Sequence, residues 1–161
     1  MSDQEGLSER AAFERLYHEL GSHVCNFLQL SIGNSSVADD LTQETFLHFW
    51  RRREAFDPGR GPVKAYLLGI ARKKAADWWR RNKGMAEPIA EPMSSATDNL
   101  IIRDAMNQLP EESRAVLWLR EVEGYSYEEL ANIFSVPLGT VRSRLHAARQ
   151  QLRTIWTKGA Q

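Results

Sequence analysis

The 161-residue sequence contains one cysteine, Cys25, and no long apolar run. One cysteine excludes an intrachain disulfide and a zinc site built from several cysteines, and it fits a reducing cytoplasm. The longest apolar run, residues 65–71, is far shorter than the ~20 residues of a membrane span. The first ten residues have no basic start and no apolar stretch, so we expect no secretory signal there. The sequence thus predicts a cytoplasmic protein without membrane insertion.

The sequence also lacks net charge, because its 21 basic side chains equal its 21 acidic ones. Zero net charge argues against a nucleic-acid partner, but the charges are unevenly distributed. Residues 51–84 carry +8 and residues 142–161 carry +5, whereas residues 1–50, 85–98 and 99–141 carry −6, −3 and −4. Basic clusters are typical of phosphate binding. Solvated helix faces are the alternative interpretation.

Sequence motifs of catalysis are absent too. The chain has neither a G-x-x-x-x-G-K-[ST] phosphate loop nor an H-E-x-x-H metal-binding helix. His18, His23 and His48 lack ligand spacing, and Cys25 has no motif partner. We therefore expect no enzyme activity, no catalytic residues, no metal and no cofactor.

Two regions with helical periodicity flank a segment that has none. Residues 85–98 (MAEPIAEPMSSATD) contain two prolines, two serines and no aromatic residue, which is typical of a linker. No segment alternates apolar and polar residues for long enough to form a strand. The sequence predicts an all-α protein: two small helical domains, residues 1–84 and 99–161, joined by a flexible linker.

Apolar spacing in the first domain predicts three helices. They are expected over residues 8–30, 36–56 and 63–81. Ser36 and Asp39 have the spacing of a capping box that would open the second helix. Trp78 falls on the apolar side of the third helix, so we expect it to be buried.

The second domain has the pattern of a helix-turn-helix. Ser126 and Glu129 form a capping box that opens a short helix, and residues 135–137 form a tight turn. A longer helix is predicted over residues 138–155. A short turn between two helices places the second helix in the DNA major groove.

The longer helix has two different faces at about 100° per residue. Its apolar stripe contains Val141, Leu145, Ala148 and Leu152. Its exposed face contains Arg142, His146, Arg149 and Arg153. No acidic residue follows Glu129, although solvated basic helices usually include acids for ion pairs. The pattern favours DNA binding, through phosphate contacts or bidentate reading of guanine, over a solvated basic helix.

Two blocks of sequence carry a more specific signal. The first is ADDLTQETFLHFWRRR (38–53) with GPVKAYLLGIARKKAADWWRR (61–81), and the second is LPEESRAVLWLREVEGYSYEELANIFSVPLGTVRSRLHAARQQL (109–152). In this order they resemble bacterial RNA polymerase sigma factors of the extracytoplasmic-function (ECF) subfamily. The resemblance implies a factor that binds core polymerase and directs promoter-specific initiation. It further implies that the first domain is sigma region 2 and the second is sigma region 4.

The resemblance also implies roles for single positions in the first domain. The segment that binds the β′ clamp helices of polymerase is matched by Asp39, Asp40, Gln43 and Glu44. Recognition and melting of the −10 element would fall to Lys64, Tyr66, Arg72, Lys73, Lys74, Arg80 and Arg81. The aromatic residues Tyr66, Trp78 and Trp79 are candidates for stacking on unpaired bases, with core packing as the alternative. Dipole stabilisation by a first-turn acid is the alternative role that we expect of Asp39.

In the second domain the −35 element would be recognised by the longer helix. The matching positions are Arg142, Ser143, Arg144, His146 and Arg149, together with Arg120 ahead of the helix-turn-helix. Lys73 departs from the family, which commonly has asparagine there, and His146 and Ala147 replace residues that are often bulkier or basic. These departures imply an altered promoter preference.

The partners implied by the resemblance are core polymerase (β′ clamp helices and β flap), promoter DNA and a cognate anti-sigma factor. A stand-alone helix-turn-helix transcriptional regulator is the alternative, but it would need an effector or dimerisation domain. The acidic linker matches the segment that passes toward the RNA exit path of polymerase. Its 14 residues reach about 45–50 Å when extended, so they permit both a separated arrangement and a compact one that would hide the basic faces.

Overall fold

The computed structural model describes residues 2–82 and 104–159, and this part of the chain is helical without any strand. Its main helices are α1 (Ser2–Ile32), α2 (Ser35–Arg51), α3 (Val63–Arg81), α5 (Glu111–Glu121), α6 (Tyr127–Phe134) and α7 (Leu138–Gly159). Two short 3-10 helices, Arg53–Ala55 and Pro58–Arg60, lie between α2 and α3. The predicted all-α class is confirmed. The predicted linker, residues 85–98, lies outside the described residues, and the domain boundaries stay predictions.

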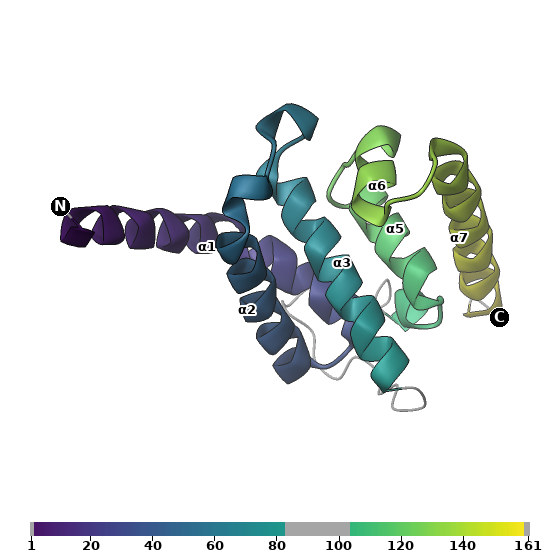
Figure 1. Ribbon diagram of the computed structural model, residues 1–161. Helices are drawn as coiled ribbons and strands as arrows, with labels where there is room; N and C mark the ends of the chain where they lie inside the picture. The colour runs from purple at the N-terminus through teal and green to yellow at the C-terminus, as the bar shows by residue number, and fades with distance from the viewer. Residues whose placement is uncertain (1, 83–103, 160–161) are drawn as a thin grey trace.

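Helices α1, α2 and α3 form the first bundle, which packs around large apolar side chains. Phe27 from α1, Phe46 from α2 and Leu67 from α3 are each at most 1% exposed. The first half of α1 extends beyond this bundle as a single rod (Figure 1). The helix thus begins earlier than the predicted residue 8, because polar residues continue it into solvent where no apolar stripe marks it.

The start of α2 differs from the prediction. Asn34, and not Ser36, caps the helix: its side-chain oxygen accepts a hydrogen bond of 3.1 Å from the Val37 backbone N–H. The capping box predicted for Ser36 and Asp39 is therefore wrong. Asparagine and serine cap helices about equally well. The cap is the residue that directly follows Gly33, where α1 has ended and the backbone turns with a φ of +82°. Helix α2 also ends earlier than predicted, at Arg51.

Helices α5, α6 and α7 form the second bundle, and α6 and α7 are the predicted helix-turn-helix. The capping box of α6 is confirmed, because the Ser126 hydroxyl accepts from the Glu129 N–H and the Glu129 carboxylate accepts from the Ser126 N–H. Ser135 ends α6 in the left-handed conformation, with φ +53°. That residue turns the chain within three positions into α7.

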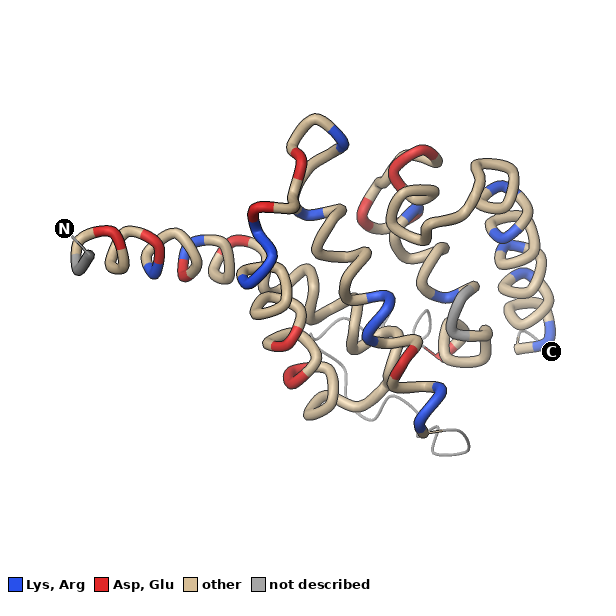
Figure 2. The backbone as a smooth tube through the Cα atoms, viewed as in Figure 1, with Lys and Arg blue, Asp and Glu red and all other residues tan. Residues whose placement is uncertain are grey.

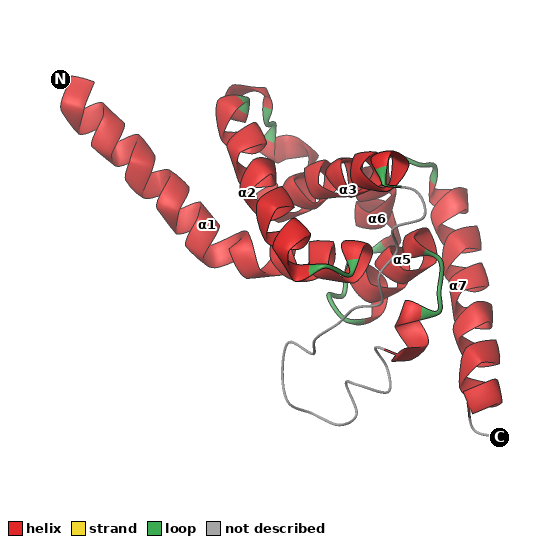
Figure 3. Cartoon of the chain, turned by 90° about the horizontal axis from the view of Figure 1, so that it is seen from below, coloured by secondary structure: helices red, strands yellow, loops and turns green. Residues whose placement is uncertain are grey.

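The two bundles pack against each other, and one hydrophobic cluster runs through both. Helix α6 lies against α3, and α5 against the end of α1 (Figure 3). Gly69 of α3 lies at this contact, and a Cβ built there would be 3.6 Å from the Ile133 carbonyl oxygen of α6, which is an ordinary contact distance. Glu123, between α5 and α6, joins the bundles through contacts of 3.2 Å to Lys64 and 3.5 Å to His23. The two bundles are therefore docked on each other, and only the first half of α1 projects from them.

Candidate nucleic-acid interface

Helix α7 presents its basic face to solvent at the edge of the molecule. Val141, Leu145 and Ala148 are each at most 1% exposed and seat the helix on α5 and α6. On the opposite face, five residues are exposed: Arg142, Ser143, His146, Arg149 and Arg153. Basic residues recur along α7 without any acid (Figure 2). The compact arrangement does not hide this face, contrary to what we expected of a compact form.

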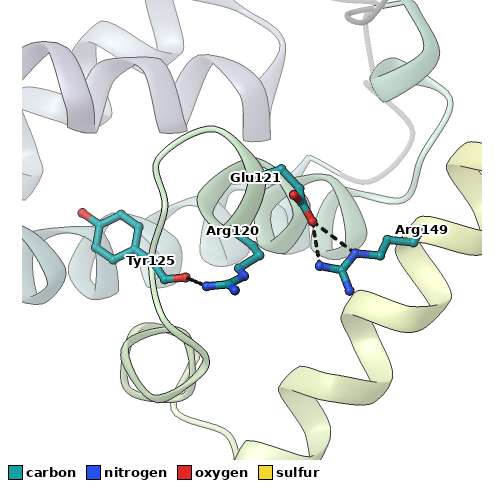
Figure 4. Close-up of polar contacts among 4 residues, drawn as sticks. All are labelled: Arg120, Glu121, Tyr125 and Arg149. Atoms are coloured by element: carbon teal, nitrogen blue, oxygen red, sulfur yellow. Dashed lines mark hydrogen bonds and ion pairs between the residues drawn. The ribbon is translucent and has the colours of Figure 1, made fainter.

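Arg142 and Arg149 differ in their surroundings. Arg142 makes no hydrogen bond or ion pair within the described residues, so its guanidinium is available to a ligand. Arg149 donates from Nε and Nη2 to Glu121 Oε1, at 3.1 and 2.6 Å (Figure 4). The pKa of Arg149 is raised above the ordinary value of an arginine, mainly because of this hydrogen bond to Glu121. Arg149 would have to exchange this carboxylate for a phosphate or a base.

Arg120 and Arg144 are less available than the exposed arginines of α7. Arg120 donates from Nη1 to the Tyr125 carbonyl oxygen at 2.8 Å (Figure 4), and its guanidinium carbon lies 4.8 Å from the Tyr127 ring centroid. Arg144 is half-buried and engaged with neighbouring groups. In this conformation Arg120 holds the turn between α5 and α6 in place.

The predicted −10 residues divide between two sides of α3. Tyr66, Lys73, Arg80 and Arg81 are exposed. Lys64 is 27% exposed and bound to Glu123, and Arg72 is half-buried one turn after Gly69. The docked second bundle therefore covers Lys64 and leaves most of the basic face of α3 open.

Two of the cations on α3, Lys74 and Arg80, form ion pairs with acidic residues. Arg80 forms an ion pair with Asp77 one turn earlier, and Lys74 Nζ lies 3.9 Å from a carboxylate oxygen of Glu44 on α2. Both pairs are solvent-accessible, so each contributes little to stability and is easily exchanged for a phosphate.

The aromatic residues of α3 differ in their exposure. Trp78, which we expected to be buried, is half-buried and packs edge-to-face with Trp79 at 5.0 Å. Trp78 also packs against the hydrophobic cluster, so its prediction as a core residue is met in part. Trp79 donates from Nε1 to the Ser31 carbonyl oxygen at 2.9 Å, which fixes its ring. Tyr66 is 40% exposed, the largest exposed fraction among the aromatic side chains of α3, and its ring also packs against Phe49 and Phe56.

Helix α2 presents the residues predicted to bind polymerase. Asp39, Asp40, Gln43 and Glu44 are all exposed. Because α2 begins at Ser35, its first turn contains no acid, and Asp39 lies in the second turn. The dipole interaction falls off within the first turn, so that interpretation of Asp39 is wrong. Asp39 instead accepts a hydrogen bond of 3.3 Å from the Cys25 thiol.

Two further features are absent from the described residues. They contain no group of three or more acidic, histidine or cysteine side chains that could hold a metal ion. None of their helices has the length and apolar character needed to cross a membrane. The candidate interface in the described residues is a set of exposed cations, one exposed tyrosine and a separate acidic helix face.

Comparisons with known proteins give consistent matches over both bundles. The family model for sigma-70 region 2 matches residues 16–84, and that for sigma-70 region 4 matches residues 99–152. The ECF RNA polymerase sigma factor SigL of Mycobacterium tuberculosis is 30% identical over 91% of this chain and 89% of its own length. The RNA polymerase sigma factor CarQ of Myxococcus xanthus is 32% identical over 89% of this chain and 88% of its own length.

A solved structure supports the fold. It contains the sigma factor RpoE in complex with the anti-sigma factor NepR, from Bartonella quintana. The match has a TM-score of 0.76 and 24% identity, and it covers 91% of this chain and 97% of the other. At this identity the similarity concerns the arrangement of the helices alone.

Proposed function

The chain belongs to the ECF sigma factors of bacterial RNA polymerase, and on that premise we propose how its surfaces divide the work of promoter recognition. A sigma factor binds core polymerase and directs initiation at promoters. In our proposal α7 reads the −35 element, the open face of α3 engages the −10 element, and the exposed acids of α2 hold the β′ clamp helices.

The observation that carries this proposal is the pair of separate surfaces on one chain. Helix α7 has a cationic face without acids, and α2 has an exposed acidic face. A stand-alone regulator needs only the first surface and is not favoured, because the first bundle matches sigma region 2. We further propose that the protein acts in the cytoplasm without catalysing a reaction itself and that an anti-sigma factor controls it.

Promoter binding would require the compact arrangement to open. The −10 and −35 elements are about 25 base pairs apart, or about 85 Å along the duplex at 3.4 Å per base pair. Helices α3 and α6 are in contact in the structure, so the two bundles cannot reach both elements while docked. The contacts of Glu123 with Lys64 and His23 would be broken when polymerase binds.

Promoter-specific run-off transcription with purified core polymerase tests the proposal. The wild-type chain should confer initiation, whereas a regulator would bind DNA alone and give no transcript. Glu44→Lys should weaken core binding, because it places a cation on the acidic face of α2. Glu5→Lys, an equal charge change on the projecting part of α1, is the matched control and should bind core normally. Equal core affinity of the two variants would contradict the role of α2.

A further inference from the structure

A pocket of about 450 Å³ opens between α2 and α3, and most of its lining residues have no role in the proposed function. It is lined by Glu44, Leu47, His48, Arg51, Arg52 and Lys74. Two of these, Arg51 and Arg52, come from the end of α2, and Lys74 reaches the pocket from α3. The helices therefore bring together cations that are about 22 residues apart in the sequence.

The charge of this pocket is largely uncompensated. The side chains of Arg51 and Arg52 make no ion pair within the part of the chain that the structure describes. Glu44 is the one acid of the lining, and it lies 3.9 Å from Lys74. Desolvation, followed by the nearby charges of Lys74, Arg52, Lys73 and Arg51, lowers the pKa of His48. Part of this lowering thus comes from the cations that surround the imidazole.

We propose that this pocket is a phosphate site that binds a backbone phosphate of the promoter DNA strand beside the −10 segment. Arginine guanidinium groups donate in a planar fork that matches two phosphate oxygens, and Lys74 adds a point charge. The proposal rests on the proposed function and adds Arg51 and Arg52 to its DNA-binding surface.

Continuity with α3 favours a DNA strand over a free anion. Lys73 and Lys74 are adjacent, and Lys73 is exposed on the open face of α3 that also presents Tyr66. A strand whose bases reach that face would carry its phosphates toward the pocket. Bound single strands are typically held in this way, by a cationic groove along the backbone and aromatic side chains against the bases.

Glu44 connects this pocket to the polymerase surface. Its carboxylate is 59% exposed and faces Lys74, which is 23% exposed. A cation of polymerase that binds Glu44 would remove the counter-ion of Lys74 and raise the positive potential of the pocket. Phosphate binding would then be stronger in the holoenzyme than in the free factor.

The salt dependence of DNA binding tests the site. The double variant Arg51→Gln/Arg52→Gln is assembled with core polymerase, and its affinity for a single-stranded −10 oligonucleotide is measured by fluorescence anisotropy at several salt concentrations. Losing one phosphate contact should reduce the slope of log affinity against log salt by about 0.7. Arg15→Gln/Arg60→Gln removes the same charge at two exposed positions outside the pocket and should keep the wild-type slope.

The outcomes separate this site from the proposed function. A variant that binds core normally and has a reduced slope supports the site, and a slope equal to that of the control overturns it. Failure of the wild-type chain to form a holoenzyme would overturn the proposed function instead, and this site with it.

A second measurement on the full chain identifies the source of the phosphate. In an NMR titration of the His48 ring, the oligonucleotide should raise its pKa toward the ordinary value, because a bound phosphate offsets the surrounding cations. Inorganic phosphate at the same phosphate concentration should have a smaller effect. A full effect from inorganic phosphate, with none from the oligonucleotide, would overturn a DNA strand as the ligand.

Discussion

At the scale of the residue, the surroundings of Cys25 disfavour the thiolate, which is the reactive form of a cysteine. The side chain is half-buried, and its Sγ donates to Asp39 at 3.3 Å. Burial, followed by the hydrogen bond to Asp39, raises the pKa of the thiol. The thiolate is the reactive form, so less of it is present at a given pH than in a free cysteine.

We therefore expect alkylation of Cys25 by iodoacetamide at pH 8 to be slower in the folded protein than in urea. Asp39→Asn should accelerate the reaction of the folded protein, because it removes the negative charge that opposes thiolate formation. Asp40→Asn, one residue further along the same helix, should leave the rate unchanged. Equal rates for folded and unfolded wild-type protein would contradict this account. Mass spectrometry of the single thiol gives the rates.

Arg142 and Arg149 should contribute differently to DNA binding. Arg142 makes no ion pair within the described chain, so Arg142→Ala should cost about 1–3 kcal/mol of discrimination between promoter and scrambled DNA if it reads a base. Arg149 must first leave Glu121, so Glu121→Gln should tighten DNA binding by freeing it. Competition binding of the holoenzyme to the two DNAs measures both effects.

The neutral change Gln150→Ala, on the exposed surface of the same helix, is the control for both substitutions. An equal loss on promoter and scrambled DNA would make Arg142 a phosphate contact. An unchanged affinity in Glu121→Gln would mean that the ion pair with Glu121 does not compete with DNA for Arg149.

At the scale of the element, the N-termini of α2 and α6 show what local sequence can predict and what it cannot. The capping box at Ser126 was predictable because both hydrogen bonds lie within four residues of sequence. At α2 two capping residues, Asn34 and Ser36, stood close together, and only the path of the chain after α1 selects between them. The pocket could not be predicted, since Arg51 and Lys74 meet only through tertiary packing.

The choice of cap predicts a difference in stability. Asn34→Ala should lower the free energy of unfolding by about 1 kcal/mol, because the Val37 N–H loses its acceptor. Ser36→Ala should be close to neutral, because Ser36 is an exposed position inside the helix where alanine has the higher propensity. Urea unfolding measures both variants through their midpoints at constant slope. A larger loss in Ser36→Ala would restore serine as the cap.

At the scale of the whole molecule, docking of the two bundles was not predictable from either helical pattern. The periodicity of α3 marks Leu67 and Ala71 for the core of the first bundle, where both are 0% exposed. It does not show that α6 of the second bundle packs on the other side of α3. At Gly69 the backbone of α6 leaves room for a Cβ but not for a large side chain, because a Cβ there would already be 3.6 Å from the Ile133 carbonyl oxygen. The side of α3 that packs against α6 could therefore be identified only from the folded structure.

Substitutions of Gly69 should therefore open the molecule or leave it closed according to their size. In Gly69→Ala the new Cβ lies 3.6 Å from the Ile133 carbonyl oxygen, which is an ordinary contact, so docking should persist. Alanine should also stabilise α3 by up to about 1 kcal/mol over glycine. In Gly69→Leu the side chain needs the space of the α6 backbone, so the bundles should separate while each keeps its core.

Energy transfer between dyes on cysteines at the exposed positions 54 and 151, in a Cys25→Ser background, measures this separation. The efficiency should stay high in Gly69→Ala and fall in Gly69→Leu, as it should when wild-type protein binds core polymerase. The open variant should also bind core more tightly, because polymerase no longer has to break the docking contacts. Unchanged energy transfer in Gly69→Leu would mean that α6 is not held on this face of α3. Tighter core binding without loss of energy transfer would separate polymerase affinity from docking.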